Sequence, residues 1–363
     1  MKLVNLKLTD YRNCRDIVLD FNSDKILITG KNAQGKTNIL ESIYFLSSLK
    51  SPRTSNNIEF INFDAEKTEI NANVIKSDTE IELDYSLSKD KSRELKVNKV
   101  KTTPKNFKSV LSTVLFSTPD LLLMRGNPSD RRDWLDRAIS QVYPAYDERL
   151  SRYDKIRVQK NNFLKAGGIN DDLLDVYNEQ LAITGSNIIY LRKKFLKEIG
   201  KIAQEKHRII SAAEDLEIEY YCSFLSDECE IEEIASAFKN ALEERKSEEI
   251  RRALSCVGPH RDDILFYINN SEASKYASQG QQRTVVLALK LSELDIITEK
   301  TGDEPILLLD DVLAELDDLR QNYLLKSINA ETQTIITSVD TVLFEEEFLR
   351  DVKIYKIEKG KII

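Results

Sequence analysis

The chain has few of the residues that mark secreted, metal-binding or membrane proteins. Only four cysteines occur among 363 residues, none of them in a C-x-x-C pair, and only two histidines are present to complete a zinc site. No apolar run approaches the ~20 residues of a membrane helix, and the first residues, MKLVNLKLTDYRNC, alternate apolar with polar side chains, unlike a signal peptide. These absences predict a cytoplasmic protein with free thiols, no zinc and no membrane partner.

Glycine and proline are also scarce, at 11 and 7 residues, which argues against a disordered or collagen-like chain. Hydrophobic residues make up 41% of the sequence and charged residues 31%, as in an ordinary globular protein. The length predicts either one large domain with an insertion or two domains. The net charge of −8 argues on average against a nucleic-acid partner, but a basic face can exist within an acidic chain.

The spacing of apolar residues divides the chain into three parts. Short alternating runs at the beginning predict strands, the middle has helical spacing, and strands alternate with helices again after Cys256. The simplest architecture is an α/β domain made of residues 1–118 and 257–363, interrupted by a helical arm of residues 119–256.

The arm contains the clearest helical pattern of the sequence. Apolar residues spaced by alternating threes and fours predict a heptad seam formed by Leu174, Tyr177, Leu181, Thr184, Ile188, Leu191 and Phe195. Gly167-Gly168, followed by Asn170 and Asp171, predicts a turn and a helix cap before this seam. We therefore expect a short antiparallel coiled-coil-like hairpin.

A glycine-rich motif near the beginning of the chain predicts a phosphate-binding loop. GKNAQGKT matches G-x-x-x-x-G-K-[ST] and lies between a short apolar strand and the helical segment NILESIYFL. Lys36 is expected to bind the β- and γ-phosphates, and Thr37 to give its hydroxyl to Mg²⁺. The alternative is a glycine-rich turn without a ligand. The expected nucleotide-binding residues are Gly30, Lys31, Asn32, Ala33, Gln34, Gly35, Lys36, Thr37 and Asn38.

A second motif, ILLLDD, is an apolar run that ends in two carboxylates. Buried parallel strands deliver their carboxyl ends to the edge of the sheet where phosphate loops also open. Asp310 is therefore expected to hold Mg²⁺, and Asp311 to activate the attacking water as a general base. Acidic residues are also common at strand ends in proteins without any such function. The two aspartates therefore indicate nucleotide hydrolysis only in combination with the phosphate loop.

A third motif, SQGQ, precedes a helix whose apolar positions are Val285, Ala288, Leu291 and Leu294. The amides at the beginning of this helix and the Ser278 hydroxyl predict a second anion site. Two helix N-termini of one domain do not readily hold one γ-phosphate. We therefore expect this segment to complete the nucleotide site of a second protomer.

In this order, the motifs resemble those of the ABC-type ATPase heads of the SMC-like class and, within that class, those of the RecF family of bacterial recombination proteins. The residues that carry the resemblance span most of the chain: YRN at 11–13, GKNAQGKTN at 30–38, RGNPSDRRDWLD at 125–136, GPHRDD at 258–263, ASQGQQR at 277–283 and LLLDDVLAELD at 307–317.

The resemblance implies an ATP-dependent homodimer in which each nucleotide lies between one protomer's residues 30–37 and the other protomer's Ser278, Gln279, Gly280 and Gln281. Residues Ala314, Glu315, Leu316 and Asp317 would lie at the dimer interface. Lys36, Asp311 and Ser278 would support a weak, DNA-stimulated ATP hydrolysis that acts as a switch, with Mg²⁺ on Thr37 and Asp310. The family binds single-stranded DNA, gaps and junctions, and acts with RecO and RecR to load RecA onto DNA coated by SSB, in the nucleoid.

The sequence also departs from related heads. Thr337 stands where transporter-type heads carry a switch histidine, and we expect it to sense the γ-phosphate. Asp311 stands where many heads have glutamate, which predicts slower hydrolysis. The glutamine that such heads place near Mg²⁺ is not identifiable. An alternative function is an SMC-type head that organises chromosomes, but the arm is too short for a long coiled coil.

Four basic or titratable residues keep two interpretations each. Arg131 and Arg132 are candidate DNA contacts, or they form ion pairs within the arm. His260 in GPHRDD belongs to a ligand site or, as we favour, closes the junction by structural hydrogen bonds. Arg12 reaches the nucleotide or is an ordinary surface arginine.

Overall fold

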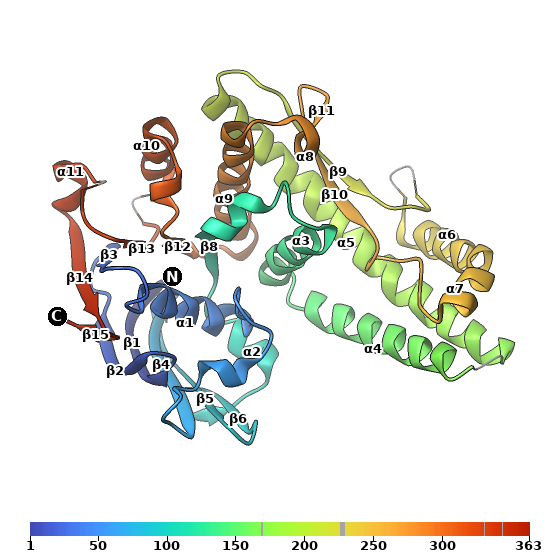
Figure 1. Ribbon diagram of the computed structural model, residues 1–363, viewed down its shortest axis with the longest axis horizontal. Helices are drawn as coiled ribbons and strands as arrows, with labels where there is room; N and C mark the ends of the chain where they lie inside the picture. The colour runs from blue at the N-terminus through green and yellow to red at the C-terminus, as the bar shows by residue number, and fades with distance from the viewer. Residues whose placement is uncertain (168–169, 226–228, 330, 343) are drawn as a thin grey trace. The chain divides into compact units, whose positions relative to one another are not determined.

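The computed structural model describes all residues except 168–169, 226–228, 330 and 343 (Figure 1). It contains two compact units: unit 1, residues 1–121 and 286–363, and unit 2, residues 122–285. The predicted α/β fold with a helical insertion is confirmed. Residues 257–285, which the sequence pattern assigned to the α/β domain, group with the helical unit because β10 pairs with β9 there.

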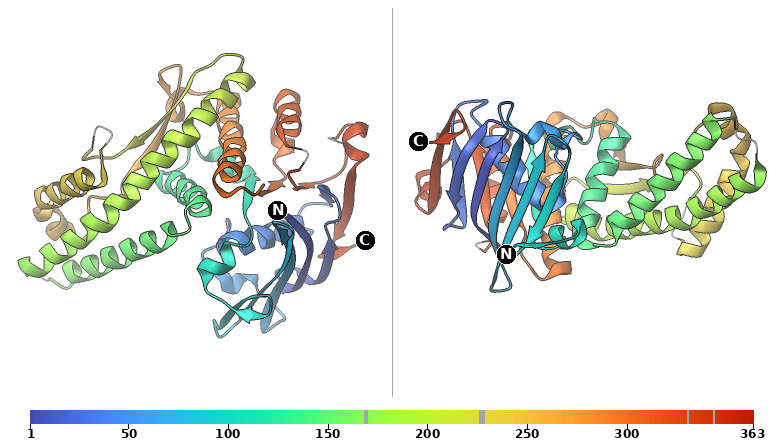
Figure 2. Two further views of the ribbon diagram at one scale, coloured as in Figure 1. Left: turned by 180° about the vertical axis from the view of Figure 1, so that it is seen from behind. Right: turned by 90° about the horizontal axis from the view of Figure 1, so that it is seen from below.

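Unit 1 begins with an antiparallel sheet of order β2-β1-β4-β5-β6-β7, whose strands lie side by side in the right-hand view of Figure 2. Its strands are β1 (Lys2–Tyr11), β2 (Cys14–Asp20), β4 (Lys67–Lys76), β5 (Thr79–Ser88), β6 (Arg93–Val97) and β7 (Val100–Lys101). Apolar and polar residues alternate in these strands, as in Leu6 and Leu8 of β1, so that one face enters the core.

The second sheet of unit 1 has the order β15-β14-β3-β13-β12-β8 and positions the candidate site. Its strands are β3 (Lys25–Thr29), β8 (Thr113–Ser117), β12 (Ile306–Asp310), β13 (Thr334–Ser338), β14 (Val352–Glu358) and β15 (Lys361–Ile362). All pairs except β14 with β15 are parallel, and Asp310 lies in register with Ser117 on one side and Thr337 on the other. The carboxyl ends of the parallel strands β14, β3, β13, β12 and β8 therefore meet at one edge.

Helices of unit 1 fill the space beside the two sheets. Helix α1 contributes residues such as Ile39 and Ile43 to one core that also contains residues of both sheets. The helical elements are α1 (Lys36–Ser48), η1 (Asn57–Phe60), α2 (Pro104–Lys108), η2 (Thr118–Leu122), η3 (Leu313–Glu315), α10 (Asp318–Ser327) and α11 (Glu346–Leu349). Helix α9 (Gln279–Thr301) begins in unit 2 and ends in unit 1.

Unit 2 is mainly helical and contains a small antiparallel sheet of order β11-β10-β9. Its elements are α3 (Pro128–Val142), α4 (Tyr146–Lys165), α5 (Asp171–Ser211), β9 (Leu216–Tyr221), α6 (Ile231–Glu244), α7 (Lys246–Arg252), β10 (Asp263–Ile268), β11 (Ser271–Glu272) and α8 (Ala273–Tyr276). Helices α4 and α5 pack along each other as the expected hairpin, visible in both figures. Asn170 caps α5 by accepting from the Leu173 amide, whereas Gly168 of the predicted turn lies outside the described residues.

Four of the seven residues predicted for the heptad seam of α5 are buried. Leu174, Leu181, Ile188 and Phe195 are buried, but Tyr177, Thr184 and Leu191 are only half-buried. The buried positions that alternate with these four apolar residues are Asn178, Gly185 and Arg192 instead. Because these side chains are polar or small, the spacing of apolar residues in the sequence does not show that they belong to the seam. Each has a specific reason for its place: Asn178 accepts from the Lys160 ammonium, Arg192 donates to the Asp136 carboxylate, and a side chain at Gly185 would collide with Phe238.

None of the helices in the described part of the chain is both long and apolar enough to cross a membrane.

Candidate nucleotide-binding site

The predicted phosphate loop connects β3 to α1 and depends on two glycines. Gly30 has φ +154°, and a Cβ there would lie 2.4 Å from the Ile357 carbonyl oxygen. Gly35 has φ +116°, and a Cβ there would lie 2.9 Å from Asn13 Oδ1. Both positions combine a conformation and a space that only glycine accepts. The loop residues 30–35 therefore expose backbone at the N-terminus of α1, which favours an anion.

Lys36 places its ammonium group over the same loop. Nζ donates to the carbonyl oxygens of Gly30, at 2.8 Å, and Lys31, at 3.4 Å, and lies 3.9 Å from Asp311 Oδ2. The side chain is buried, so its charge is poorly hydrated. A phosphate group beside the loop would therefore meet a preplaced positive charge.

Two threonine hydroxyls meet the carboxylate of Asp310 at the edge of the parallel sheet. Thr37 Oγ1 donates to Asp310 Oδ1 over 3.0 Å, and Thr337 Oγ1 donates to the same oxygen over 2.8 Å. Burial raises the pKa of Asp310 above its ordinary value. A cation would offset the cost of burying this charge. Mg²⁺ prefers oxygen ligands, so the donor set formed by Thr37 and Asp310 fits this ion.

Asp311 differs from Asp310 in environment. Its backbone has φ +51°, a left-handed conformation that few non-glycine residues adopt, and its amide donates to Thr337 Oγ1 over 2.9 Å. Its carboxylate is partly exposed and reaches toward Lys36. The turn therefore directs two consecutive carboxylates into different surroundings, one buried between hydroxyls and one open to water.

A cavity of about 610 Å³ opens beside the loop, a size typical of small-molecule sites. Its lining includes Arg12, Lys36, Thr37, Phe63 and Asp311. A second cavity of about 290 Å³ is lined by Asp310 and shares Thr37 and Asp311 with the first. The residues predicted for nucleotide and metal are thus brought together.

Arg12 lines the larger cavity but is already engaged. Its guanidinium donates to the buried carboxylate of Glu41, with one contact of 2.7 Å, and lies 5.3 Å from the centre of the Phe60 ring. Arg12 is therefore not an ordinary surface arginine, because its side chain is largely buried in an ion pair; its contact with a nucleotide stays a prediction.

Phe63 and Ser117 were missed in the sequence. Phe63 is 99% exposed although it lines the cavity, which is unusual for a large apolar side chain. It lies in a polar loop, so no periodicity marks it. Ser117 lies beside Asp310 in the sheet, and its hydroxyl donates to Asp120 over 2.7 Å.

The predicted second anion site begins α9. Ser278 Oγ accepts from the Gln281 amide over 3.2 Å, and Gln281 Oε1 accepts from the Ser278 amide over 2.8 Å, a reciprocal capping box. Ser278 and Gln279 are exposed, and the apolar positions predicted for this helix are buried. The side chain of Gln281 also donates to Glu214 over 2.7 Å. The motif is therefore an ordered helix start with an accessible serine.

The segment Ala314–Asp317 contains the short helix η3 and the cap of α10. Ala314 and Asp317 are exposed, Leu316 is buried, and Asp317 accepts from the Arg320 amide over 3.0 Å. Its expected place at a dimer interface stays a prediction.

Arg131 and Arg132 are engaged within unit 2. The guanidinium of Arg131 donates to both oxygens of Asp263, each over 2.8 Å, and the residue is only 7% exposed. Arg132 donates to the Asp262 carbonyl oxygen over 2.6 Å. Contact of Arg131 with DNA would require this buried pair to break. The contacts therefore favour an ion pair within unit 2 for Arg131, whereas the contact of Arg132 is with a backbone carbonyl and does not decide between its two interpretations.

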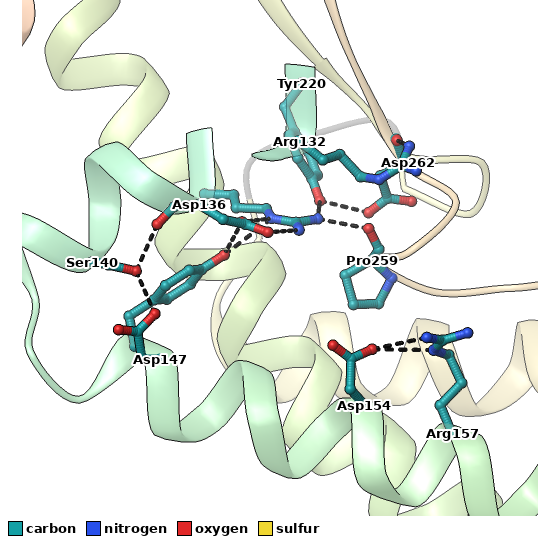
Figure 3. A network of polar contacts seen from close by, with 11 residues as sticks. Arg132, Asp136, Ser140, Asp147, Asp154, Arg157, Tyr220, Pro259 and Asp262 are labelled. Atoms are coloured by element: carbon teal, nitrogen blue, oxygen red, sulfur yellow. Dashed lines mark hydrogen bonds and ion pairs between the residues drawn. The ribbon is translucent and has the colours of Figure 1, made fainter. Parts of the chain in front are cut away.

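Near these arginines lies a buried polar network, drawn in Figure 3, that joins α3, α5, β9 and the GPHRDD segment. Arg192, 2% exposed, donates to both oxygens of Asp136, each over 2.8 Å, and to the Pro259 carbonyl oxygen over 2.6 Å. Tyr220 donates to Asp262 over 2.6 Å. The network holds the elements of unit 2 together.

His260 has the structural contacts that we favoured. Its Nε2 lies 3.2 Å from the Ser255 carbonyl oxygen, which can only accept, so Nδ1 accepts from the Tyr153 hydroxyl at 2.7 Å. Burial lowers the pKa of His260 to about 3, so the ring is neutral at pH 7.

The sequence matches the family described as RecF/RecN/SMC N terminal domain over residues 2–362. It is 39% identical over 370 residues to the DNA replication and repair protein RecF of Bacillus subtilis (strain 168), covering 100% of both chains. It is 38% identical over 370 residues to the RecF protein of Staphylococcus carnosus (strain TM300), again covering 100% of both.

Solved structures give the same relationship. A structure described as the recombination mediator protein RecF-ATP in the RecFOR pathway matches with a TM-score of 0.90 and 34% identity, covering 99% of this chain and 96% of that one. The Smc head domain of Pyrococcus furiosus matches with a TM-score of 0.56 and 14% identity, covering 99% and 95%. This second match shows a shared fold.

Proposed function

Since the chain belongs to the RecF family of SMC-like ATPases, we propose that it is an ATP-dependent DNA-binding protein of recombinational repair and replication. The observation that carries the proposal is the meeting of Thr37, Asp310 and Thr337 beside the phosphate loop, in a chain that matches RecF proteins along its full length. A glycine-rich turn without a ligand would not need these buried polar groups around it.

ATP is the proposed ligand of the larger cavity. The loop amides and Lys36 would hold the phosphates, and the exposed ring of Phe63 offers a stacking surface to the base. Thr37 and Asp310 would hold Mg²⁺, which supplies positive charge to the phosphate oxygens when bound. The similar solved structure named above is of RecF with ATP.

The second half of each site would come from another copy of the chain. Residues 278–281 present an ordered helix start, an exposed serine hydroxyl and positive potential from the helix dipole. We propose that they contact the γ-phosphate held by the partner's loop and that residues 314–317 lie at the same interface. Neither protomer alone then completes a catalytic site.

Hydrolysis would be slow and serve as a switch. Asp311 is partly exposed and lies near Lys36, so it can accept a proton from a water molecule beside the γ-phosphate. Thr337 bonds to both aspartates of this edge, Asp310 through its side chain and Asp311 through its amide. A change at the γ-phosphate can therefore alter Thr337 and both acids together.

The proposed DNA and protein partners rest on analogy with the family. We propose single-stranded and gapped DNA as the nucleic acid, RecO and RecR as partners, and loading of RecA onto DNA coated by SSB as the outcome, in the cytoplasm at the nucleoid. Arg132, which is less buried than Arg131, remains the better of the two candidate DNA contacts.

Analytical ultracentrifugation with gapped duplex DNA tests the proposal. We expect monomers without nucleotide or with ADP, and dimers that bind the gapped DNA with ATP. The DNA affinity should fall with salt, because phosphate contacts release counterions. ATP that binds without changing the oligomeric state or the DNA affinity would rule the proposal out.

A further inference from the structure

The phosphate loop is held from outside by the turn between β14 and β15. The Gly360 amide donates to the Gln34 carbonyl oxygen over 2.9 Å, and the Lys359 amide donates to Gln34 Oε1 over 2.7 Å. Two consecutive amides of the turn therefore bind the backbone and the side chain of one loop residue. Gln34 is an unspecified position in the phosphate-loop motif, and its sequence context gives no reason for a glutamine.

The fit between the turn and the loop is close. A Cβ at Gly360 would lie 2.1 Å from the Asn13 carbonyl oxygen, and Gly360 has φ +71°. The side chain of the same Asn13 lies against Gly35, and Asn13 Oδ1 accepts from Asn38 over 2.7 Å. The loop is thus packed between the β14–β15 turn and the Arg12–Asn13 turn.

The hydrogen bond to the Gln34 carbonyl oxygen also fixes the orientation of the Gly35 N–H, which belongs to the same peptide group and points in the opposite direction. The peptide group between Gln34 and Gly35 is planar and trans, so its N–H points opposite to its C=O. Since Gly360 holds the oxygen outside the loop, the Gly35 N–H is aimed toward the loop interior. Amides with this direction are the ones that bind phosphate oxygens.

We propose that Gln34 and the β14–β15 turn form a positioning element of the nucleotide site. The turn keeps the loop amides in the phosphate-binding arrangement, and Gln34 is the residue that connects the two. This inference rests on the proposed function, because it concerns the affinity for ATP.

The test measures ATP affinity by isothermal titration calorimetry for four variants of the full chain. Gln34→Met keeps the size of the side chain but removes the acceptor for Lys359. A chain ending at Glu358 lacks both donating amides. A third variant combines the two changes, and a control chain ending at Lys361 keeps the turn but loses residues 362 and 363.

Gln34→Met is expected to weaken ATP binding about three- to tenfold, the effect of one lost hydrogen bond, and the chain ending at Glu358 about tenfold or more. In the shortened chain, Gln34→Met should add less than about twofold, because its partner is already missing. The control should stay within about twofold of the parent chain. A general loss of stability would not produce this dependence of one change on the other.

Equal ATP affinity of Gln34→Met and the parent chain would overturn the inference, and so would an undiminished effect of Gln34→Met in the shortened chain. Thermal unfolding is measured on every variant. If the chain ending at Glu358 does not fold, Gln34→Met alone decides the question. A parent chain that fails to bind ATP would instead reject the proposed function.

Discussion

The hydroxyl of Thr337 donates a hydrogen bond to Asp310 Oδ1 over 2.8 Å, from the neighbouring parallel strand. The same oxygen of Thr337 accepts the Asp311 amide, so one side chain organises both acids of the site.

Thr337→Val should remove this organisation while keeping the volume of the side chain. We expect ATP hydrolysis to fall about tenfold to a hundredfold, with ATP affinity changed much less, because Lys36 and the loop remain. Steady-state ATPase assays and calorimetry measure the two quantities. Thr334→Val is the matched control, since it removes a buried hydroxyl at the other end of the same strand. Equal hydrolysis rates in both variants would contradict the role of Thr337.

Asp311→Asn and Ser278→Arg should have opposite effects on self-association. Asp311→Asn lacks the general base, so ATP hydrolysis should slow by about a hundredfold and the ATP-bound dimer should accumulate. Ser278→Arg places a large side chain at the exposed start of α9, so ATP should still bind but the chain should stay monomeric. Sedimentation with ATP distinguishes them, and equal dimer fractions would exclude a shared site.

Phe63→Ala should weaken nucleotide binding by about 1–3 kcal/mol, the usual effect of losing one stacked base. Phe63→Trp should retain the affinity, because it keeps an aromatic surface. Val18→Ala, an exposed apolar residue on β2, is the control. An affinity for ATP that does not depend on the ring at position 63 would show that the base lies elsewhere.

Asp262→Asn should change how stability depends on pH. Burial raises the pKa of Asp262 to about 6, although Tyr220 and Arg192 favour its charge. A carboxyl with a raised pKa stabilises the fold when protonated, and this stabilisation is lost as pH rises from about 4 through about 6. The uncharged variant should therefore gain about 1–3 kcal/mol over the parent chain at pH 7 and little at pH 4. Urea unfolding at the two pH values measures the difference, and a gain independent of pH would refute it.

Arg192→Met should destabilise unit 2 strongly. It leaves the buried carboxylate of Asp136 without its bidentate partner, which typically costs about 3–5 kcal/mol. The double variant Arg192→Met with Asp136→Leu removes both charges and should recover a large part of this loss. Chemical unfolding followed by circular dichroism measures the three stabilities. A double variant as unstable as the sum of the single changes would mean that the two charges do not act together.

The sequence was most informative where a local pattern carries the chemistry. The phosphate loop and the acids at 310 and 311 follow from short apolar strands whose carboxyl ends must share an edge. The start of α9 follows from a capping residue before an apolar helix. These features depend on neighbours in the chain, so a single sequence contains them.

Features that depend on distant partners could not be derived in this way. Three of the seven seam residues predicted for α5 are not buried, because Asn178 and Arg192 occupy seam positions through their contacts with Lys160 and Asp136. The sequence left Arg131 as either a DNA contact or a member of an ion pair, because its partner Asp263 lies more than a hundred residues later in the chain. The exposure of Phe63 follows from the shape of a loop, which no periodicity encodes.

The order of strands around β3 has a consequence for synthesis of the protein. Both neighbours of β3, the strands β13 and β14, come from residues 334–358, whereas β3 itself ends at residue 29. During synthesis on the ribosome, β3, which leads into the phosphate loop, therefore cannot pair with its neighbouring strands until residues 334–358 have emerged. Unit 2 is continuous in sequence and can fold during this interval. The nucleotide site should thus be among the last parts of a nascent chain to form, and premature termination after unit 2 should yield a product with no capacity to bind ATP.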